Sequence, residues 1–178
     1  MNKKTWRQDL YKKYPMLFAQ KNLDMKQTCM CWGIECNYGW SSILDTTCTN
    51  IMGYWEHHKT TDEYKEDLKN HDEDYGPYEP QFVQIKEKYG GLRLYINNGS
   101  DRIYKIIARA ENASYLICEQ CGTSINVTSE GSWILTLCNK CRRDMHKWTL
   151  KKWINQMPSR IKWWLKRKKR KWLSPKKN

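Results

Sequence analysis

The sequence predicts an α+β protein, with a small helix, β-hairpin and helix body, a four-cysteine zinc ribbon and a basic helical tail. Three observations support this prediction. Alternating apolar residues flank Gly90-Gly91, apolar residues recur at steps of three and four on both sides of that stretch, and two Cys-x2-Cys pairs follow it. A chain of 178 residues is long enough for one domain with an appendage.

Residues 1–55 are expected to form the helical first part of the body. Thr5 is placed to cap a short helix from Trp6 to about Tyr14, which Pro15 ends. A longer amphipathic helix follows from Trp40. Its apolar face is predicted to hold Ile43, Leu44, Cys48, Ile51 and Trp55. On that face, a small buried side chain explains Cys48 better than a reactive thiol does.

Residues 56–80 are expected to form an acidic connecting loop. This stretch holds nine acidic residues against three lysines, and it ends in two prolines. Its histidines, His57, His58 and His71, are therefore interpreted as ordinary solvent-facing side chains.

Residues 81–141 are expected to hold a hairpin, a helix and the ribbon. In the hairpin, Val83, Ile85 and Tyr89 alternate on the first strand, and Leu92, Leu94 and Ile96 alternate on the second. Gly90-Gly91 would supply the positive dihedral angles of a two-residue turn. Ser100 would cap the next helix, whose core-facing stripe is Ile103, Ile106, Ile107 and Ala110.

The two Cys-x2-Cys pairs predict one structural Zn²⁺ bound by Cys118, Cys121, Cys138 and Cys141. Sixteen residues separate the pairs, and two short strands in that interval would bring the two turns together. A catalytic zinc is not expected, because four thiolates leave no open position for water. Cys29, Cys31 and Cys36 lack the spacing of such a turn, so a second zinc is not expected there.

The sequence indicates a binding protein rather than an enzyme. It shows no nucleophile with a matching base, no phosphate loop, no open metal site and no evident small-molecule substrate. Paired cysteine turns also occur in HNH nucleases, but no histidine lies between Cys121 and Cys138.

The positive charge is concentrated in residues 142–178. Residues 1–141 hold 17 Lys and Arg against 18 Asp and Glu, whereas residues 142–178 hold 15 against one. We expect a helix to Met157, a break at Pro158 and a second helix after Ser159. In residues 161–173, seven of thirteen side chains are basic and three are Trp. The candidate nucleic-acid-binding residues are Arg160, Lys162, Trp163, Trp164, Lys166, Arg167, Lys168, Lys169, Arg170, Lys171 and Trp172.

This tail predicts a polyanionic partner, with RNA or DNA favoured. Lys and Arg would neutralise phosphates while Trp stacks on exposed bases. An anionic membrane surface and a solvated tail are the alternatives for the same residues. A different alternative is a protein partner, bound by residues 32–40 and the hairpin.

The sequence favours a cytoplasmic location. No apolar stretch follows the charged first residues, and no run of about 18 apolar residues occurs.

Three segments in order, CMCWGIECNYGW, IKEKYGGLRLY and the cysteine pairs, carry a resemblance over about residues 8–142. They resemble a group of uncharacterised small proteins encoded mainly by tailed bacteriophages and prophages. The resemblance implies a phage origin and expression in a bacterial host cell, and it implies no activity. Where that group has Gly-Asp-Gly-Trp, this chain has Asn37 to Trp40.

Overall fold

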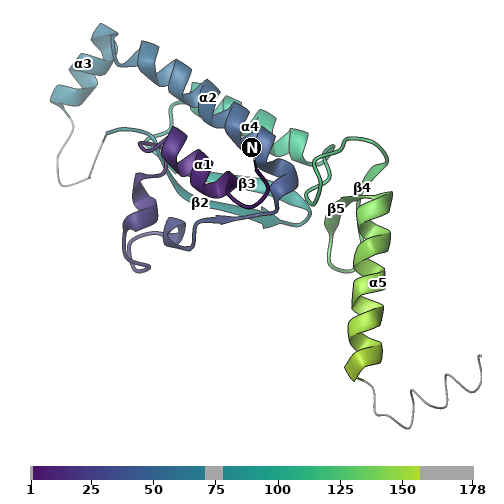
Figure 1. Cartoon of the computed structure of the whole chain (residues 1–178). Helices are drawn as coiled ribbons and strands as arrows, with labels where there is room; N and C mark the ends of the chain where they lie inside the picture. The colour runs from purple at the N-terminus through teal and green to yellow at the C-terminus, as the bar shows by residue number, and fades with distance from the viewer. Residues whose placement is uncertain (1, 71–77, 157–178) are drawn as a thin grey trace, which may run out of the picture. The chain divides into compact units, whose positions relative to one another are not determined.

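The structure is a computed structural model that describes residues 2–70 and 78–156 (Figure 1). It divides into two compact units, residues 1–139 and residues 140–178. The described part has the predicted α+β class. The described residues of the first unit form four α-helices, α1 (Trp6–Lys13), α2 (Ser41–His58), α3 (Asp62–Lys69) and α4 (Asp101–Ser114). Short 3₁₀ helices lie at Ala19–Asn22, Cys29–Trp32 and Tyr38–Trp40.

The main sheet has three strands in the order β1 (Ile34–Glu35), β2 (Gln81–Lys88) and β3 (Gly91–Asn97). β2 and β3 form the predicted antiparallel hairpin, in which Ile85 pairs with Leu94. β1 runs parallel to β2, and Ile34 pairs with Ile85. The N-terminal segment therefore contributes an edge strand to the hairpin sheet.

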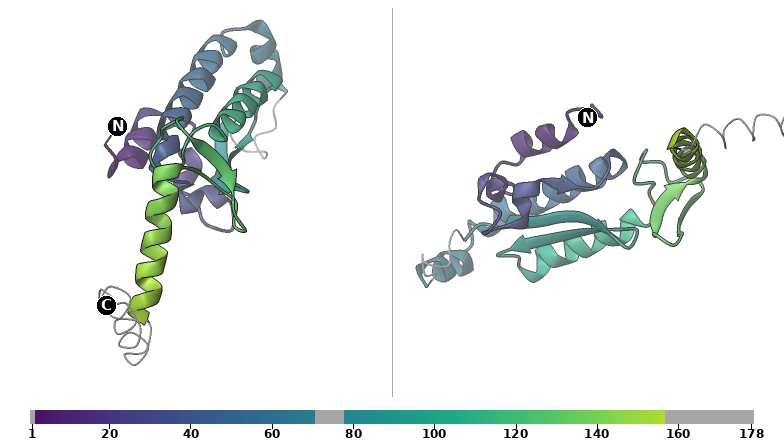
Figure 2. Two further views of the ribbon diagram at one scale, coloured as in Figure 1. Left: turned by 90° about the vertical axis from the view of Figure 1, so that its right-hand side faces the viewer. Right: turned by 90° about the horizontal axis from the view of Figure 1, so that it is seen from below.

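Helices cover one face of this sheet. Leu92, Leu94 and Ile96 are buried, whereas Tyr95 between them is exposed. Helix α4 packs against β3 and also against α2. Figures 1 and 2 show α2 and α4 lying side by side over the sheet. The core also includes Trp6 from α1.

The predicted helical stripes are confirmed. All five residues assigned to the apolar face of α2, from Ile43 to Trp55, are buried. On that face Cys48 is fully buried, and burial raises the pKa of its thiol. The predicted cap of α4 is also confirmed, because the Ile103 N–H donates to the Ser100 Oγ at 3.5 Å.

The predicted cap of α1 is wrong. Thr5 precedes α1, but its side chain accepts no hydrogen bond from the backbone of the helix. Its Oγ1 instead donates to the Asp9 Oδ2 at 3.0 Å. The hydroxyl is therefore engaged by a carboxylate one turn ahead, and α1 ends at Lys13.

The predicted hairpin turn is displaced by one residue. Lys88 pairs with Gly91, so Tyr89 and Gly90 form the two-residue turn, with φ of 53° and 76°. Gly91 belongs to β3, and a Cβ there would collide with the Tyr115 hydroxyl. The second glycine is thus needed for close packing. Val83 was expected to lie on the same face of the strand as Ile85. This prediction is wrong, because the register of the pairing shifts between Phe82 and Gln84.

The described residues at the start of the acidic stretch, 56–70, form helices rather than the predicted loop. α2 continues to His58, and Thr61 caps α3 by accepting the Tyr64 N–H at 3.2 Å. The His58 ring stacks on Tyr54 at a centroid distance of 5.4 Å and lies 5.7 Å from Tyr64. Contacts between aromatic rings thus pack α3 against the end of α2. The acidic composition of the stretch does not predict this packing. His71 lies outside the described residues.

The ribbon and the last helix follow α4. Strands β4 (Val127–Glu130) and β5 (Leu135–Cys138) pair antiparallel, and α5 (Asn139–Gln156) continues the second cysteine pair, as predicted. The predicted end of this helix at Met157 lies outside the described residues. The break at Pro158 and the second helix also lie there. Within the described residues, no helix is both long and apolar enough to cross a membrane.

Candidate metal centre

The two cysteine pairs come together in the structure. Cys118 and Cys121 flank a turn after α4, Cys138 ends β5, and Cys141 lies in the first turn of α5. One ligand atom from each of these four cysteines lies within 4.8 Å of every other. They form a group that could hold a metal ion, which confirms the predicted clustering.

The spacing of the sulfur atoms fits a tetrahedral ion. Cys121 Sγ and Cys138 Sγ are 3.8 Å apart. Four thiolates at about 2.3 Å from a central ion have sulfur–sulfur distances of about 3.8 Å. All eight cysteines of the chain lie within the described residues, and none forms a disulfide. The donor set of four soft thiolates suits Zn²⁺ and other thiophilic ions.

Backbone hydrogen bonds shape the first cysteine turn. The Gly122 N–H donates to the Cys118 carbonyl at 2.8 Å, and the Cys118 N–H donates to the Thr123 carbonyl at 2.8 Å. These bonds fold the chain back so that Cys118 and Cys121 face the same point. Gly122 has φ of +81°, a conformation that side chains other than glycine rarely adopt.

The β4–β5 ribbon brings the second pair to the first. Val127 pairs with Cys138 across the ribbon, and the Asn139 N–H donates to the Asn126 carbonyl at 3.1 Å. The Glu119 N–H also donates to the Thr136 carbonyl at 3.0 Å. The cysteine turn is therefore joined to β5 by its backbone as well as by any bound ion.

The segment Asn37–Trp40 forms a seat for the first cysteine turn. The Gly39 N–H donates to the Glu119 carbonyl at 2.7 Å. The Trp40 Nε1–H donates to the Ile117 carbonyl at 2.8 Å, and the Trp40 side chain is fully buried. A Cβ on Gly39 would overlap the carbonyl oxygens of Cys118 and Glu119. Two backbone segments thus meet without an intervening side chain.

Glu119 is a buried carboxyl that sequence reasoning missed. Its Oε1 accepts from both the Asn37 N–H and the Asn37 Nδ2, each at 3.0 Å. Burial raises the pKa of Glu119, although the hydrogen bonds from Asn37 oppose this, and nearby Glu87 adds to the increase. The residue is only a spacer inside Cys-x2-Cys, so no sequence signal marks it. Asn37 is the first residue of the segment that stands where the resembling group has Gly-Asp-Gly-Trp, and it donates both of these hydrogen bonds to the carboxyl.

Thr136 joins the β4–β5 ribbon to the β2–β3 hairpin by a hydrogen bond. It is fully buried, its Oγ1 donates to the Gly90 carbonyl, and it lies 2.6 Å from the Ser129 Oγ. The tip of the β2–β3 hairpin therefore contacts the middle of β5. Sequence reasoning missed this residue as well, because it occupies an ordinary strand position.

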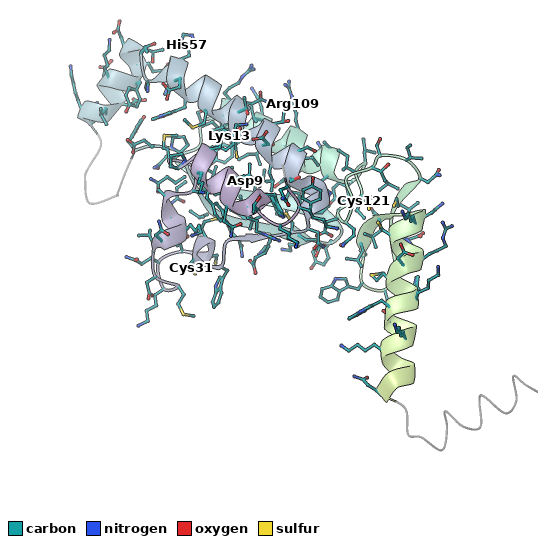
Figure 3. All side chains as sticks on the ribbon, viewed as in Figure 1. Asp9, Lys13, Cys31, His57, Arg109 and Cys121 are labelled. Carbon is teal, nitrogen blue, oxygen red and sulfur yellow. The ribbon has the colours of Figure 1, made fainter. Side chains whose placement is uncertain are left out.

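The remaining cysteines lie elsewhere. Cys36 and Cys48 are buried in the core, and Cys29 is exposed. Burial raises the pKa of Cys36, and the Glu119 charge raises it further while Arg7 opposes the increase. Figure 3 shows Cys31 and Cys121 well apart within the first unit.

The eleven tail residues predicted to bind nucleic acid, from Arg160 to Trp172, lie outside the described residues. The described part of the basic segment is α5. It carries exposed cations at Lys140, Arg143, Lys147, Lys151 and Lys152, with Asp144 as its acidic residue.

Comparison of the chain with protein-family models, with curated proteins and with solved structures found no match.

Proposed function

We propose that this protein is a non-enzymatic, zinc-binding protein that associates with nucleic acid through its basic, tryptophan-rich C-terminal segment. One observation carries the proposal. Trp148, Lys151 and Lys152 lie at steps of three and four on α5 and line a common hollow together with Gln156.

This face of α5 joins two kinds of contact that a nucleic acid strand uses. Trp148 is 64% exposed, and the Lys152 Nζ lies 5.2 Å from the centre of its ring. An exposed indole offers a surface on which a base can stack, while neighbouring ammonium groups neutralise phosphates. The pattern of α5 repeats in residues 161–173 of the tail, where basic residues again surround tryptophans. Binding is mainly through phosphates and has little sequence preference.

The bound ion is proposed to be zinc, one per chain, with a structural role. The four-thiolate set and the 3.8 Å distance from Cys121 Sγ to Cys138 Sγ support it. Cys118, Cys121, Cys138 and Cys141 would hold the ion, and the ion would stabilise the ribbon.

The resemblance to phage-encoded proteins supports a place in the cytoplasm of a bacterial host cell. A host protein was the alternative partner, bound through residues 32–40 and the hairpin. Gly39 and Trp40 of that segment are buried against the cysteine turn, and Asn37 is hydrogen-bonded to Glu119. These contacts remove much of that segment from the surface and favour the nucleic acid.

The test is the salt dependence of binding to a labelled single-stranded oligonucleotide. Affinity of the full chain should fall with salt, with a log–log slope of about −0.7 for each phosphate contacted. Changing Lys151→Ala and Lys152→Ala together should reduce both the affinity and the slope. Lys3→Ala with Lys4→Ala removes two exposed cations from the other end of the chain and serves as the matched control.

Two results would overturn the proposal. One is an affinity for single strands that the Lys151 and Lys152 changes leave unaltered. The other is tight binding to anionic lipid vesicles with weak binding to nucleic acid at the same ionic strength, which would indicate a membrane-surface segment.

A further inference from the structure

A second aromatic surface lies in the first unit, apart from α5. A groove of about 420 Å³ runs between the tips of the two hairpins. It is lined by Glu87, Lys88, Tyr89, Ser132, Trp133 and Ile134. The hydrogen bond from Thr136 to the Gly90 carbonyl joins the tip of the β2–β3 hairpin to β5.

Two aromatic rings in this groove are left largely in water. Trp133 is 76% exposed and Tyr89 is 71% exposed. Neither ring contributes to the hydrophobic core. The Lys88 Nζ lies 5.5 Å from the centre of the Tyr89 ring, so a cation accompanies the aromatic pair.

The backbone of Tyr89 adds an independent observation. Its φ of 53° is a left-handed conformation, which is unfavourable for a side chain other than glycine. In the described residues, the other two non-glycine positions with positive φ are Asn98 and Asn126, and asparagine tolerates this conformation well. Asn-Gly is the favoured sequence for such a two-residue turn, yet this turn is Tyr89-Gly90. A tyrosine is unfavourable at this turn position, and its ring is exposed to solvent. The ring therefore does not stabilise the fold, which points to a role in binding.

We propose that the groove between Tyr89 and Trp133 binds a base of single-stranded nucleic acid by stacking. The inference rests on the nucleic-acid function proposed above and names unpaired strands as its substrate. Charge decides between a strand and an apolar peptide as the occupant. Lys88 borders the groove, and its ammonium group can neutralise a phosphate next to a stacked base. The carboxylate of Glu87 is engaged with the Gly90 N–H at 2.6 Å.

The experiment compares two ligands that share phosphates and differ in bases. Full-length, metal-loaded protein is titrated with a labelled oligothymidine and with an abasic strand of the same length. The ratio of the two dissociation constants measures stacking, and the salt slope measures phosphate contacts.

Trp133→Ala and Tyr89→Asn should each lower the preference for the oligothymidine by about tenfold, the effect of losing one stacked base. Both should leave the salt slope unchanged. Tyr89→Asn should also raise the melting temperature or leave it unchanged, because Asn-Gly suits the turn. Reduced binding in a protein of equal or greater stability separates the ring's role from folding. Trp32→Ala is the matched control, since Trp32 is 64% exposed but lies outside the groove.

An unchanged preference in both groove variants, with binding retained, would overturn the groove and leave the proposed function standing. That is also the result expected if the groove serves a protein ligand. An equal loss in Trp32→Ala would likewise overturn it. A full chain that binds neither strand would refute the proposed function itself, and the inference with it.

Discussion

At the scale of single residues, Gly39 is the position at which the structure leaves least room for a side chain. Its N–H binds the Glu119 carbonyl, and the space that a Cβ would occupy is filled by backbone atoms of the cysteine turn. Backbone cannot rotate away as a flexible side chain can. The glycine is therefore required by a contact between distant segments, and its own turn does not reveal that requirement.

We predict that Gly39→Ala destabilises the protein by about 2 kcal/mol, the usual scale for adding a methyl group where there is no room. The matched control is Gly53→Ala in α2, where a Cβ would meet no atom within 4 Å. That change should stabilise the protein by about 0.5 to 1 kcal/mol, because alanine is the better helix former. Urea denaturation measures both. Equal effects of the two substitutions would contradict the close approach at Gly39.

At the scale of elements, the ribbon shows how far sequence reasoning reaches. The spacing of the four cysteines predicted the cluster, because the geometry of two thiolates on one tight turn is local. The turn that carries Cys118 is also shaped by Gly122, directly after the pair. What holds the ribbon on the body is not local. Glu119 and Thr136 form hydrogen bonds with residues that are distant in sequence. Neither a glutamate nor a threonine at its position allows such a partner to be predicted.

The hairpin illustrates the same limit. The existence of its two antiparallel strands was predicted correctly, but the phase of Val83 was wrong and the turn was placed one residue late. Local turn preference favours two glycines, but the pairing of Lys88 with Gly91 places the turn at Tyr89-Gly90. Gly91 is instead required by a tertiary contact, because a Cβ there would overlap the Tyr115 hydroxyl. The acidic stretch was misread for a similar reason, since its helix α3 is supported by aromatic neighbours.

The ribbon leads to a prediction about metal. Protein purified without added metal should hold one zinc ion per chain, and Cys121→Ser should lose it together with cooperative melting of the ribbon. Cys29→Ser is the matched control, because Cys29 is exposed and lies outside the cluster. Elemental analysis and thermal melting measure the two effects. A zinc content near two would point to the N-terminal cysteines, and a content near zero would refute the centre.

At the scale of the whole molecule, charge and packing divide the chain at nearly the same place. Residues 1–141 have a net charge of −1, and residues 142–178 have a net charge of +14. The boundary between the two compact units lies between residues 139 and 140 of the sequence. The hydrophobic core draws on residues between Trp6 and Ile117. The core residues that the structure describes and the excess of positive charge therefore lie in different parts of the chain.

This division predicts that the first unit folds and stays stable without the basic segment. A chain ending at Lys147, which keeps all four metal-binding cysteines, should retain its zinc. Its melting temperature should stay within about 2 °C of the full chain, since every core residue in the part of the chain that the structure describes precedes Lys147. It should lose most of its affinity for nucleic acid. A large drop in melting temperature would show that the core depends on residues after Lys147.

The seat beneath the cysteine turn also has a consequence for the order of events during synthesis. The hydrogen bond from the Asn37 N–H to Glu119 joins residues 82 apart in sequence, and that from Trp40 to Ile117 joins residues 77 apart. A ribosome must therefore add most of the first unit before the Trp40 Nε1–H can meet its acceptor. Contacts of this range form slowly because a long loop must close first. Until then the indole N–H of the nascent chain lacks its carbonyl partner, and the arrival of Ile117 supplies that partner.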